Sequence, residues 1–266
     1  MNNPFFTRFA FILFLCASTF LAGAALAQTK ILVGLSTINS RVTPLWIAEE
    51  KGFFAKNGLE VLVVATRVSQ PAIAALIAGE LQLVFGGASS ALGAFSGGAD
   101  LRVIAIASNR LTYDLMARPG VRKPEDLRGK SFGVGAIGGA LWMGSMLALE
   151  YFGLDASRDQ ISIRPVGDQT NNIQALEAGS IDATLLDGVF SYRLKQKGFP
   201  VLAEFYNANI AFAGQGVVAT RALLQMQPSV AENFLRGLLA EDNDVGSEDK
   251  VEDLVDDRIL RKILGG

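Results

Sequence analysis

The chain has 266 residues, a formal net charge of −2 from 24 basic and 26 acidic residues, no histidine and one cysteine. Without a strongly basic surface there is no electrostatic reason to expect nucleic acid as a partner. The one cysteine, Cys16, lies in an apolar N-terminal run, so the rest of the chain has no disulfide and no thiolate nucleophile. Because the chain has no histidine, a histidine metal ligand and a histidine general base are excluded as well.

The N-terminus has the pattern of a secretory signal peptide. Arg8 precedes an apolar run over residues 9–21, and small residues then lead to Ala25-Leu26-Ala27. This predicts that residues 1–27 are cleaved and that the mature chain is periplasmic. A membrane anchor is the alternative, but the run is short for a bilayer. A lipoprotein is a second alternative, although Leu15 stands where a small residue is needed before Cys16.

Strand-like and helix-like segments alternate through the first half of the chain. Strands are expected at residues 30–35, 60–65, 81–85 and 101–107. Helices are expected from 43 to a stop at Gly52, from about Ser69, and over residues 91–95. In the first of these, Thr43 is expected to be the N-cap and Pro44 the first helical residue.

The second half repeats this order. Strands are expected at residues 131–135, 160–166, 181–186 and 200–203, with helices at 140–152, 170–178 and 189–197. Beyond residue 204 the chain is expected to cross back to a short strand at 216–219 and a helix at 228–239. Residues 241–257 are rich in acidic side chains and predict a solvated linker. The linker is expected to give way to an amphipathic helix capped near Ser247, with an apolar stripe of Val251, Leu254, Val255, Ile259 and Ile263.

An internal repeat connects the two halves. Ile73–Phe85, IAALIAGELQLVF, recurs 100 residues later as Ile173–Leu185, IQALEAGSIDATL, and each helix ends at a glycine, Gly79 or Gly179. Chance is an alternative for one short match, but the strand starts at 31, 60 and 81 also have counterparts near 131, 160 and 181. The expected fold is therefore α/β, with two lobes, each a mostly parallel sheet flanked by helices, and a cleft between them.

Candidate ligand-binding residues follow from this fold, because open α/β sheets bind ligands beyond the carboxyl ends of their strands. In the first lobe they are Ser36, Thr37, Asn39, Thr43, Arg67, Ser69, Gly87 and Ser89. In the second lobe they are Gly135, Gly138, Gly139, Gln169, Thr170 and Asp187. Arg67 suits an anion, whereas Asp187 suits an amine or a ring N–H, so the charge of the ligand stays open.

The glycines before two of the helices have two possible roles. They can leave the first backbone N–H groups of the helix open for an anion or a polar head group, or they can only turn the chain. Gly133 to Gly138 also match a dinucleotide fingerprint, but the acid after the next expected strand, Asp168, comes too late in the chain to bind a ribose. No cofactor, metal or catalytic residue is expected, although a Ser-Lys or carboxylate pair stays open.

Several segments together closely resemble the nitrate/sulfonate/taurine-type periplasmic substrate-binding proteins of ABC importers. They are LWIAEEKGFFAKNGLEV (45–61), A-L-x-A-G-E-L-Q (75–82), RKPEDLRGKSFGV (122–134), ALEAGSIDAT (175–184) and GVVATRALL (216–224). The resemblance implies a type II periplasmic-binding-protein fold with two crossovers. Lobe one would comprise residues 28–111 and 206–266, and lobe two residues 112–205. It also implies a monomer that captures a small organic or oxyanion solute for a membrane permease and is not an enzyme.

The chain departs from this family near its end. The family usually has further helices between a segment like residues 233–236 and an ending like residues 255–260, where this chain has a short acidic stretch. This resembles an internal deletion and predicts that lobe one lacks part of its covering layer. Two other functions stay open: an enzyme similar to the related thiamine-pyrimidine synthases, which resemble one another in using a histidine, or a degenerate copy that binds nothing.

Overall fold

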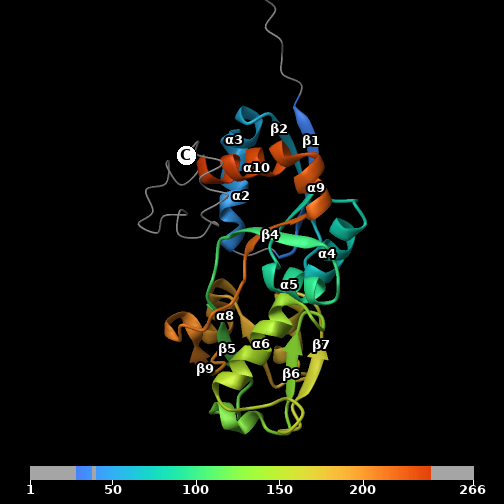
Figure 1. The fold of residues 1–266 in the computed structure, drawn as a ribbon. Helices are drawn as coiled ribbons and strands as arrows, with labels where there is room; N and C mark the ends of the chain where they lie inside the picture. The colour runs from blue at the N-terminus through green and yellow to red at the C-terminus, as the bar shows by residue number, and fades with distance from the viewer. Residues whose placement is uncertain (1–27, 38–39, 241–266) are drawn as a thin grey trace, which may run out of the picture.

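The computed structural model describes residues 28–37 and 40–240, which form two lobes placed end to end (Figure 1). We call the lobe that contains the first sheet lobe one and the lobe that contains the second sheet lobe two. The predicted signal peptide, Asn39 and the predicted apolar stripe after residue 250 lie outside the described residues.

The sheet of lobe one has the strand order β2-β1-β3-β10-β4. Its strands are β1 (Thr29–Leu35), β2 (Leu59–Ala65), β3 (Leu83–Phe85), β4 (Leu101–Ile106) and β10 (Gly216–Thr220). Strand β1 pairs in parallel with β2 and β3, whereas β10 runs antiparallel to β3 and β4. One strand from the end of the described chain therefore completes a sheet that the first half of the chain begins.

The sheet of lobe two has the equivalent order, β7-β6-β8-β5-β9. Its strands are β5 (Asp114–Ala117), β6 (Ser131–Val134), β7 (Ser162–Pro165), β8 (Ala183–Leu186) and β9 (Val201–Glu204). Here β5 is the antiparallel strand. The prediction of two mostly parallel sheets is confirmed, but β5 was not predicted. Its four residues are all buried, so they show no alternation between apolar and polar side chains.

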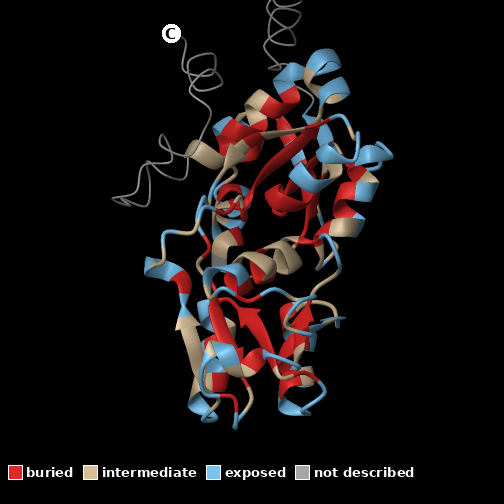
Figure 2. Ribbon diagram, turned by 60° about the horizontal axis from the view of Figure 1, so that its bottom comes forward, coloured by how far each residue is buried: buried red, intermediate tan, exposed pale blue. Residues whose placement is uncertain are grey.

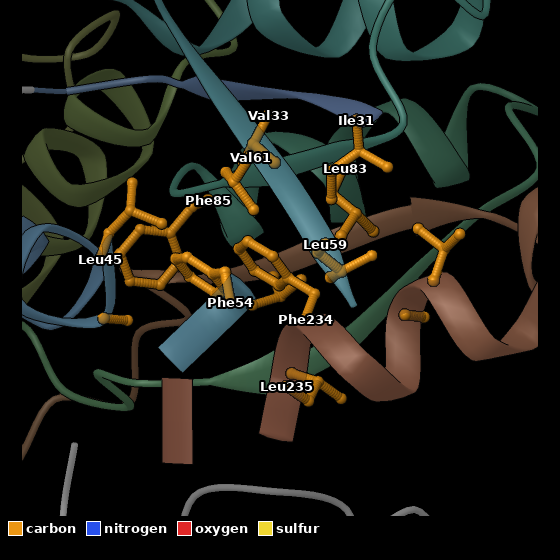
Figure 3. Packing of buried hydrophobic residues seen from close by; sticks show 14 of the residues in the cluster. Ile31, Val33, Leu45, Phe54, Leu59, Val61, Leu83, Phe85, Phe234 and Leu235 are labelled. Carbon is orange, nitrogen blue, oxygen red and sulfur yellow. The ribbon is translucent and has the colours of Figure 1, made fainter. Parts of the chain in front are cut away.

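Helices cover both faces of the sheet in lobe one. On one face lie α2 (Thr43–Glu50), α3 (Phe53–Lys56) and α10 (Pro228–Ala240), and on the other α4 (Ser69–Ile77) and α5 (Ala88–Ser96). Phe54 stacks on Phe234 with ring centres 5.0 Å apart, which joins α3 to α10 (Figure 3). At the edge of the sheet, Leu62 and Val64 of β2 stay 38% and 39% exposed.

Lobe two is layered in the same way. Helix α6 (Ala140–Tyr151) covers one face, and α7 (Gln169–Glu177) and α8 (Gly188–Gln196) cover the other. Figure 2 shows the buried strands inside both lobes.

The remaining elements are α9 (Arg221–Met226) and the 3-10 turns η1 (Ser40–Val42), η2 (Pro124–Leu127) and η3 (Phe205–Asn207). Among the described residues, no helix combines the length and the apolar character needed to cross a bilayer.

Two predicted helix starts are wrong. Thr43 is not an N-cap, because η1 leads directly into α2 and Val42 holds the cap position without a side-chain hydrogen bond. Helix α5 begins at Ala88 and not at residue 91. Gly86 and Gly87, with φ of 119° and 59°, turn the chain immediately after β3, so the helix can begin three residues earlier.

Candidate functional site

A cavity of about 50 Å³ lies between the lobes. The loops that line it follow the carboxyl ends of β1, β2 and β3 in lobe one and of β6 and β7 in lobe two. The chain crosses to lobe two between β4 and β5, the first crossover, and returns between β9 and β10, the second crossover. Tyr113 of the first crossover and Gly214 and Gln215 of the second complete the wall. The cavity therefore occupies the position where parallel sheets expose loop residues and helix starts to a ligand.

Most of the predicted site residues meet at this cleft. Its wall contains Ser36, Thr37, Arg67, Ser69, Gly87, Gly135, Gly139 and Gln169. Thr170 lines an adjoining cavity of about 150 Å³ together with Thr37, Arg67, Asp168, Gln169 and Phe190.

The other predicted residues are placed differently. Ser89 and Asp187 are buried, with 3% and 2% exposure, and are not among the residues that line the cavity. A Cβ atom at Gly138 would lie 3.9 Å from Gln70 Nε2, so this glycine borders the wall. Thr43 is exposed on α2 and lines neither cavity. Asn39 lies outside the described residues.

Sequence reasoning did not single out other residues of the wall, namely Arg41, Gln70, Tyr113, Leu141 and Gln215. Arg41 and Gln70 lie in loops that the strand positions had already indicated, so their polar side chains could have been included. Tyr113 and Gln215 come from the crossovers. For Gln215 the available signal was a polar residue between two glycines directly before a strand.

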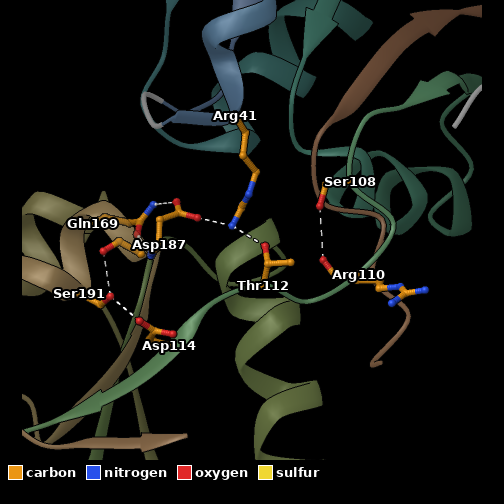
Figure 4. Close-up of polar contacts among 9 residues, drawn as sticks. Arg41, Ser108, Arg110, Thr112, Asp114, Gln169, Asp187 and Ser191 are labelled. Atoms are coloured by element: carbon orange, nitrogen blue, oxygen red, sulfur yellow. Dashed lines mark hydrogen bonds and ion pairs between the residues drawn. The ribbon is translucent and has the colours of Figure 1, made fainter. Parts of the chain in front are cut away.

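An ion pair joins the two lobes at one wall of the cleft (Figure 4). Arg41 follows β1 in lobe one, and its Nη2 pairs with Oδ1 of Asp187, the residue before α8 in lobe two. Gln169 orients the carboxylate: its Nε2 donates to Asp187 Oδ2 over 2.5 Å, and its Oε1 accepts from the Asp187 N–H over 2.7 Å. The buried carboxylate thus has both a counter-charge and hydrogen bonds, which a buried charge needs to be stable.

Arg41 also contacts the first crossover. Its Nη2 donates to Thr112 Oγ1 over 2.8 Å, and its guanidinium carbon lies 4.7 Å from the centre of the Tyr113 ring. Burial lowers the pKa of Arg41, but the neighbouring Tyr113 and Asp187 oxygens outweigh it, so its pKa is raised overall. Burial, and then the charge of Asp187, raise the pKa of Tyr113. At neutral pH the arginine is therefore charged and the phenol is neutral.

Two further side-chain contacts cross the cleft. Arg67 Nη1 lies 3.3 Å from Asp168 Oδ2, and Asp168 also accepts from the Asn171 N–H at the start of α7. Gln70 Nε2 donates to the carbonyl oxygen of Ile137 over 3.0 Å. Lobe one is thus connected to lobe two around the cavity, which is the arrangement of a closed cleft.

Several buried polar atoms at or behind this wall have no hydrogen-bond partner among the described residues. They are Ser36 Oγ, Gln70 Oε1, Ser89 Oγ, Ser90 Oγ and Gln215 Nε2. Buried polar atoms are normally hydrogen-bonded, so a group of unpartnered atoms at one cavity calls for an explanation. For the three that belong to residues lining the cavity, Ser36 Oγ, Gln70 Oε1 and Gln215 Nε2, a bound solute that hydrogen-bonds to them would provide it.

The turn at Gly86 and Gly87 allows these side chains to converge. A Cβ atom at Gly86 would overlap Ser36 Oγ and lie 3.4 Å from Gln215 Nε2 and Oε1. A Cβ atom at Gly87 would lie 2.8 Å from Ser69 Oγ. With their positive φ angles, the two glycines are required both by the backbone turn and by the space that the polar side chains occupy.

Of the two roles considered for the glycines before a helix, open N–H groups are not found for the first two residues of α5. The Ala88 N–H donates to the carbonyl of Gly214 over 3.2 Å, and the Ser89 N–H donates to that of Ala213 over 2.8 Å. These two N–H groups are therefore hydrogen-bonded to carbonyl groups of the second crossover. In lobe one, polar side chains are left to bind a ligand. In lobe two, the first turn of α6 does line the cleft, with Gly139, Ala140 and Leu141.

A Ser-Lys-carboxylate group exists in lobe two, but it does not open onto the cavity. Ser191 Oγ donates to Asp114, and Lys195 Nζ lies 3.0 Å from Asp114 Oδ2. Ser191 is fully buried, and these contacts connect α8 to β5 inside lobe two. Within the described part of the chain, no cluster of three or more metal-ligating side chains occurs.

The sequence model of the family described as NMT1/THI5 like matches residues 39–240. A comparison with curated proteins gives no match.

Solved structures with the same fold include periplasmic proteins. A protein from Bordetella bronchiseptica RB50 has a TM-score of 0.73 and 23% identity, over 88% of this chain and 78% of that one. The alkanesulfonate-binding protein SsuA from Xanthomonas axonopodis pv. citri, bound to MOPS, has a TM-score of 0.68 and 19% identity, over 89% of this chain and 83% of that one. The periplasmic nitrate-binding protein NrtA from Synechocystis PCC 6803 has a TM-score of 0.66 and 13% identity, over 81% of this chain and 62% of that one. These similarities confirm the predicted periplasmic-binding-protein fold.

Proposed function

The chain belongs to the NMT1/THI5-like family, and on this basis we propose that it is the extracytoplasmic solute-binding component of an ABC importer. It captures a small organic or oxyanion solute by closure of the two lobes. The resemblance to nitrate/sulfonate/taurine-type binding proteins supports this proposal, as do the nitrate-binding and alkanesulfonate-binding proteins with the same fold.

One observation carries the proposal: Ser36 Oγ, Gln70 Oε1 and Gln215 Nε2 are buried at a cavity between the lobes without hydrogen-bond partners among the described residues. A buried polar atom without a partner costs about 1–3 kcal/mol. A solute that hydrogen-bonds to these atoms removes that cost and is enclosed on both sides. The site is thus suited to holding a solute within a closed cleft.

The two crossovers provide a hinge for lobe closure. They pair antiparallel at Arg110 and Ala211, with the Leu111 N–H donating to Ile210 and the Phe212 N–H donating to Asn109. The proposed division of the chain, with residues 28–111 and 206–266 in lobe one and residues 112–205 in lobe two, changes lobes at or beside this ribbon. Bending the ribbon separates the walls of the cleft while each sheet remains intact.

The remaining parts of the proposal concern location and partners. Residues 1–27 act as a cleaved signal peptide, and the mature chain works in the periplasm as a monomer. Its partners are the solute and the membrane permease of the importer. Ligand-binding residues are proposed to include the predicted ones that line the cleft, together with Arg41, Gln70 and Gln215.

A solute screen tests this function. Thermal shift and isothermal titration are applied to the purified chain with nitrate, alkanesulfonates, taurine, aromatic acids and pyrimidines. A true ligand at 100 times its Kd should stabilise the protein by about 2.7 kcal/mol. For a chain of this size, that shifts Tm upward by about 5–10 °C. If a cooperatively melting protein binds no small solute in a wider library, the proposed function is wrong.

A further inference from the structure

We infer that the cleft selects a small solute without net charge, such as urea or a primary amide, over an oxyanion of the same shape. This inference rests on the proposed function and narrows its solute class. Three properties of the wall support it: how its charges are paired, which polar atoms lack partners, and how much space remains.

The charged side chains around the cavity compensate one another. Arg41 pairs with Asp187, and Arg67 pairs with Asp168. An anion that approaches the Arg41 guanidinium is also close to the buried Asp187 carboxylate, so attraction and repulsion largely cancel. Moving an anion from water into the cleft would then cost its desolvation without a free counter-charge to offset it. A neutral solute has a much smaller desolvation cost, which hydrogen bonds to the wall can offset.

The unpartnered atoms require both a donor and an acceptor from the solute. Because Gln70 Nε2 already donates to Ile137, its Oε1 is the free atom, and it can only accept a hydrogen bond. Gln215 Nε2 can only donate, and Ser36 Oγ can do either. An amide offers N–H donors and a carbonyl acceptor, whereas nitrate, acetate and sulfonates at neutral pH offer acceptors only. Gln70 would stay unsatisfied beside an oxyanion.

The cavity that the unpartnered atoms line, as distinct from the adjoining cavity of about 150 Å³, indicates the size of the group that these atoms can bind. A cavity of about 50 Å³ holds about three to five water molecules, at roughly 10–15 Å³ each. A planar molecule of about four non-hydrogen atoms replaces that number of waters. Urea and acetamide have this size.

Two sets of matched molecules isolate charge from shape. Urea, nitrate and guanidinium are planar and alike in size but carry charges of 0, −1 and +1, and acetamide, acetate and acetamidinium form a second such set. Titration of the full chain at constant ionic strength should give a Kd for urea or acetamide at least tenfold below that of its charged analogues. Tighter binding of nitrate or acetate would overturn the inference and leave the proposed function standing.

Two variants test the role of the ion pair. Asp187→Asn leaves Arg41 uncompensated and should tighten nitrate or acetate binding at least tenfold. Arg41→Gln should do the same for guanidinium or acetamidinium. Asp182→Asn is the matched control, because Asp182 pairs with Arg118 away from the cleft, and it should leave the charge preference unchanged. Unchanged preferences in both folded cleft variants would overturn the inference.

The remaining outcomes separate the two proposals. If the wild type binds none of the six molecules but binds another solute in the wider library, the charge inference is wrong and the function stands. If the cooperatively folded wild type binds no solute at all, both are wrong. Should neither cleft variant melt cooperatively, the ranking of the six molecules by the wild type decides.

Discussion

Arg41 of lobe one and Asp187 of lobe two form an ion pair across the cleft, and Asp187 is only 2% exposed. Because Arg41 also bonds to Thr112 in the first crossover, a single side chain connects lobe one, lobe two and the hinge. This side chain therefore helps to hold the two lobes in their relative position. Its loss should affect stability more than the loss of an ion pair at the surface.

Asp187→Ala should destabilise the protein by about 2–4 kcal/mol, because it leaves the largely buried Arg41 without its counter-charge. Chemical denaturation measures this. The matched control is Glu60→Ala, which breaks the Lys30–Glu60 pair, where the side chains are 61% and 48% exposed. That change should cost less than about 1 kcal/mol. Equal losses in the two variants would contradict the coupling of the lobes through Asp187.

Ser36→Ala should separate stability from binding. Ser36 Oγ is buried without a hydrogen-bond partner among the described residues, so removing it should leave the stability of the protein without solute unchanged or raise it by up to about 1 kcal/mol. Solute affinity should fall about tenfold, which corresponds to about 1.4 kcal/mol. Denaturation and titration with a solute from the screen measure the two effects.

Ser191→Ala is the matched control for this separation, because Ser191 is equally buried but donates to Asp114 in lobe two. It should lose about 1–3 kcal/mol of stability and keep its solute affinity. If Ser36→Ala loses stability and keeps its affinity, Ser36 has a structural role and does not contact the solute.

Much of the fold could be predicted from the sequence because its signals are local. The repeat of Ile73–Phe85 at Ile173–Leu185 located equivalent helices and strands, and glycines such as Gly79 and Gly179 marked the helix ends. Strand β5 escaped prediction because it is short and buried throughout, so no periodic pattern identifies it. The deletion expected near the C-terminus concerns residues that the structure does not describe, and it stays a prediction.

The site could be predicted only in part, since contacts between the lobes depend on side chains far apart in the chain. Loops such as the one with Ser36 follow from strand positions. The pairing of Arg41 with Asp187 depends on how one lobe faces the other, and Gln215 enters through the second crossover. The sequence also could not show that the Ala88 N–H donates to the carbonyl of Gly214. Because this N–H group is already bonded, side chains and not the backbone of α5 are left to bind a ligand in lobe one.

Gly86→Ala should be strongly destabilising and should abolish binding. Gly86 has φ of 119°, and a Cβ atom there would overlap Ser36 Oγ. Backbone strain alone costs about 1–3 kcal/mol, and displacement of Ser36 adds to it. Gly98→Ala is the matched control, with φ of 96° and no atom within 4 Å of the added Cβ. Equal destabilisation in both variants would contradict the crowding at Gly86, and thermal melts measure the difference.

Asp182 should make the stability of lobe two dependent on acid pH. Burial raises the pKa of this carboxyl, but hydrogen bonds from Ser131 N and Oγ, each 2.8 Å long, and the Arg118 guanidinium at 2.6 Å more than reverse this. Its pKa in the folded state is therefore lowered. A lowered folded pKa stabilises the protein above the unfolded pKa of about 3.9, and this stabilisation disappears as the pH falls through the folded pKa.

Asp182→Asn should accordingly be less stable than the wild type at pH 7, by about 1–2 kcal/mol, because it loses charged hydrogen bonds. The difference between variant and wild type should shrink as the pH is lowered from 5 towards 2, since the wild-type carboxyl then becomes protonated as well. Urea denaturation at a series of pH values measures this difference. A difference that stays constant down to pH 2 would show that Asp182 contributes through packing and neutral hydrogen bonds, and not through its charge.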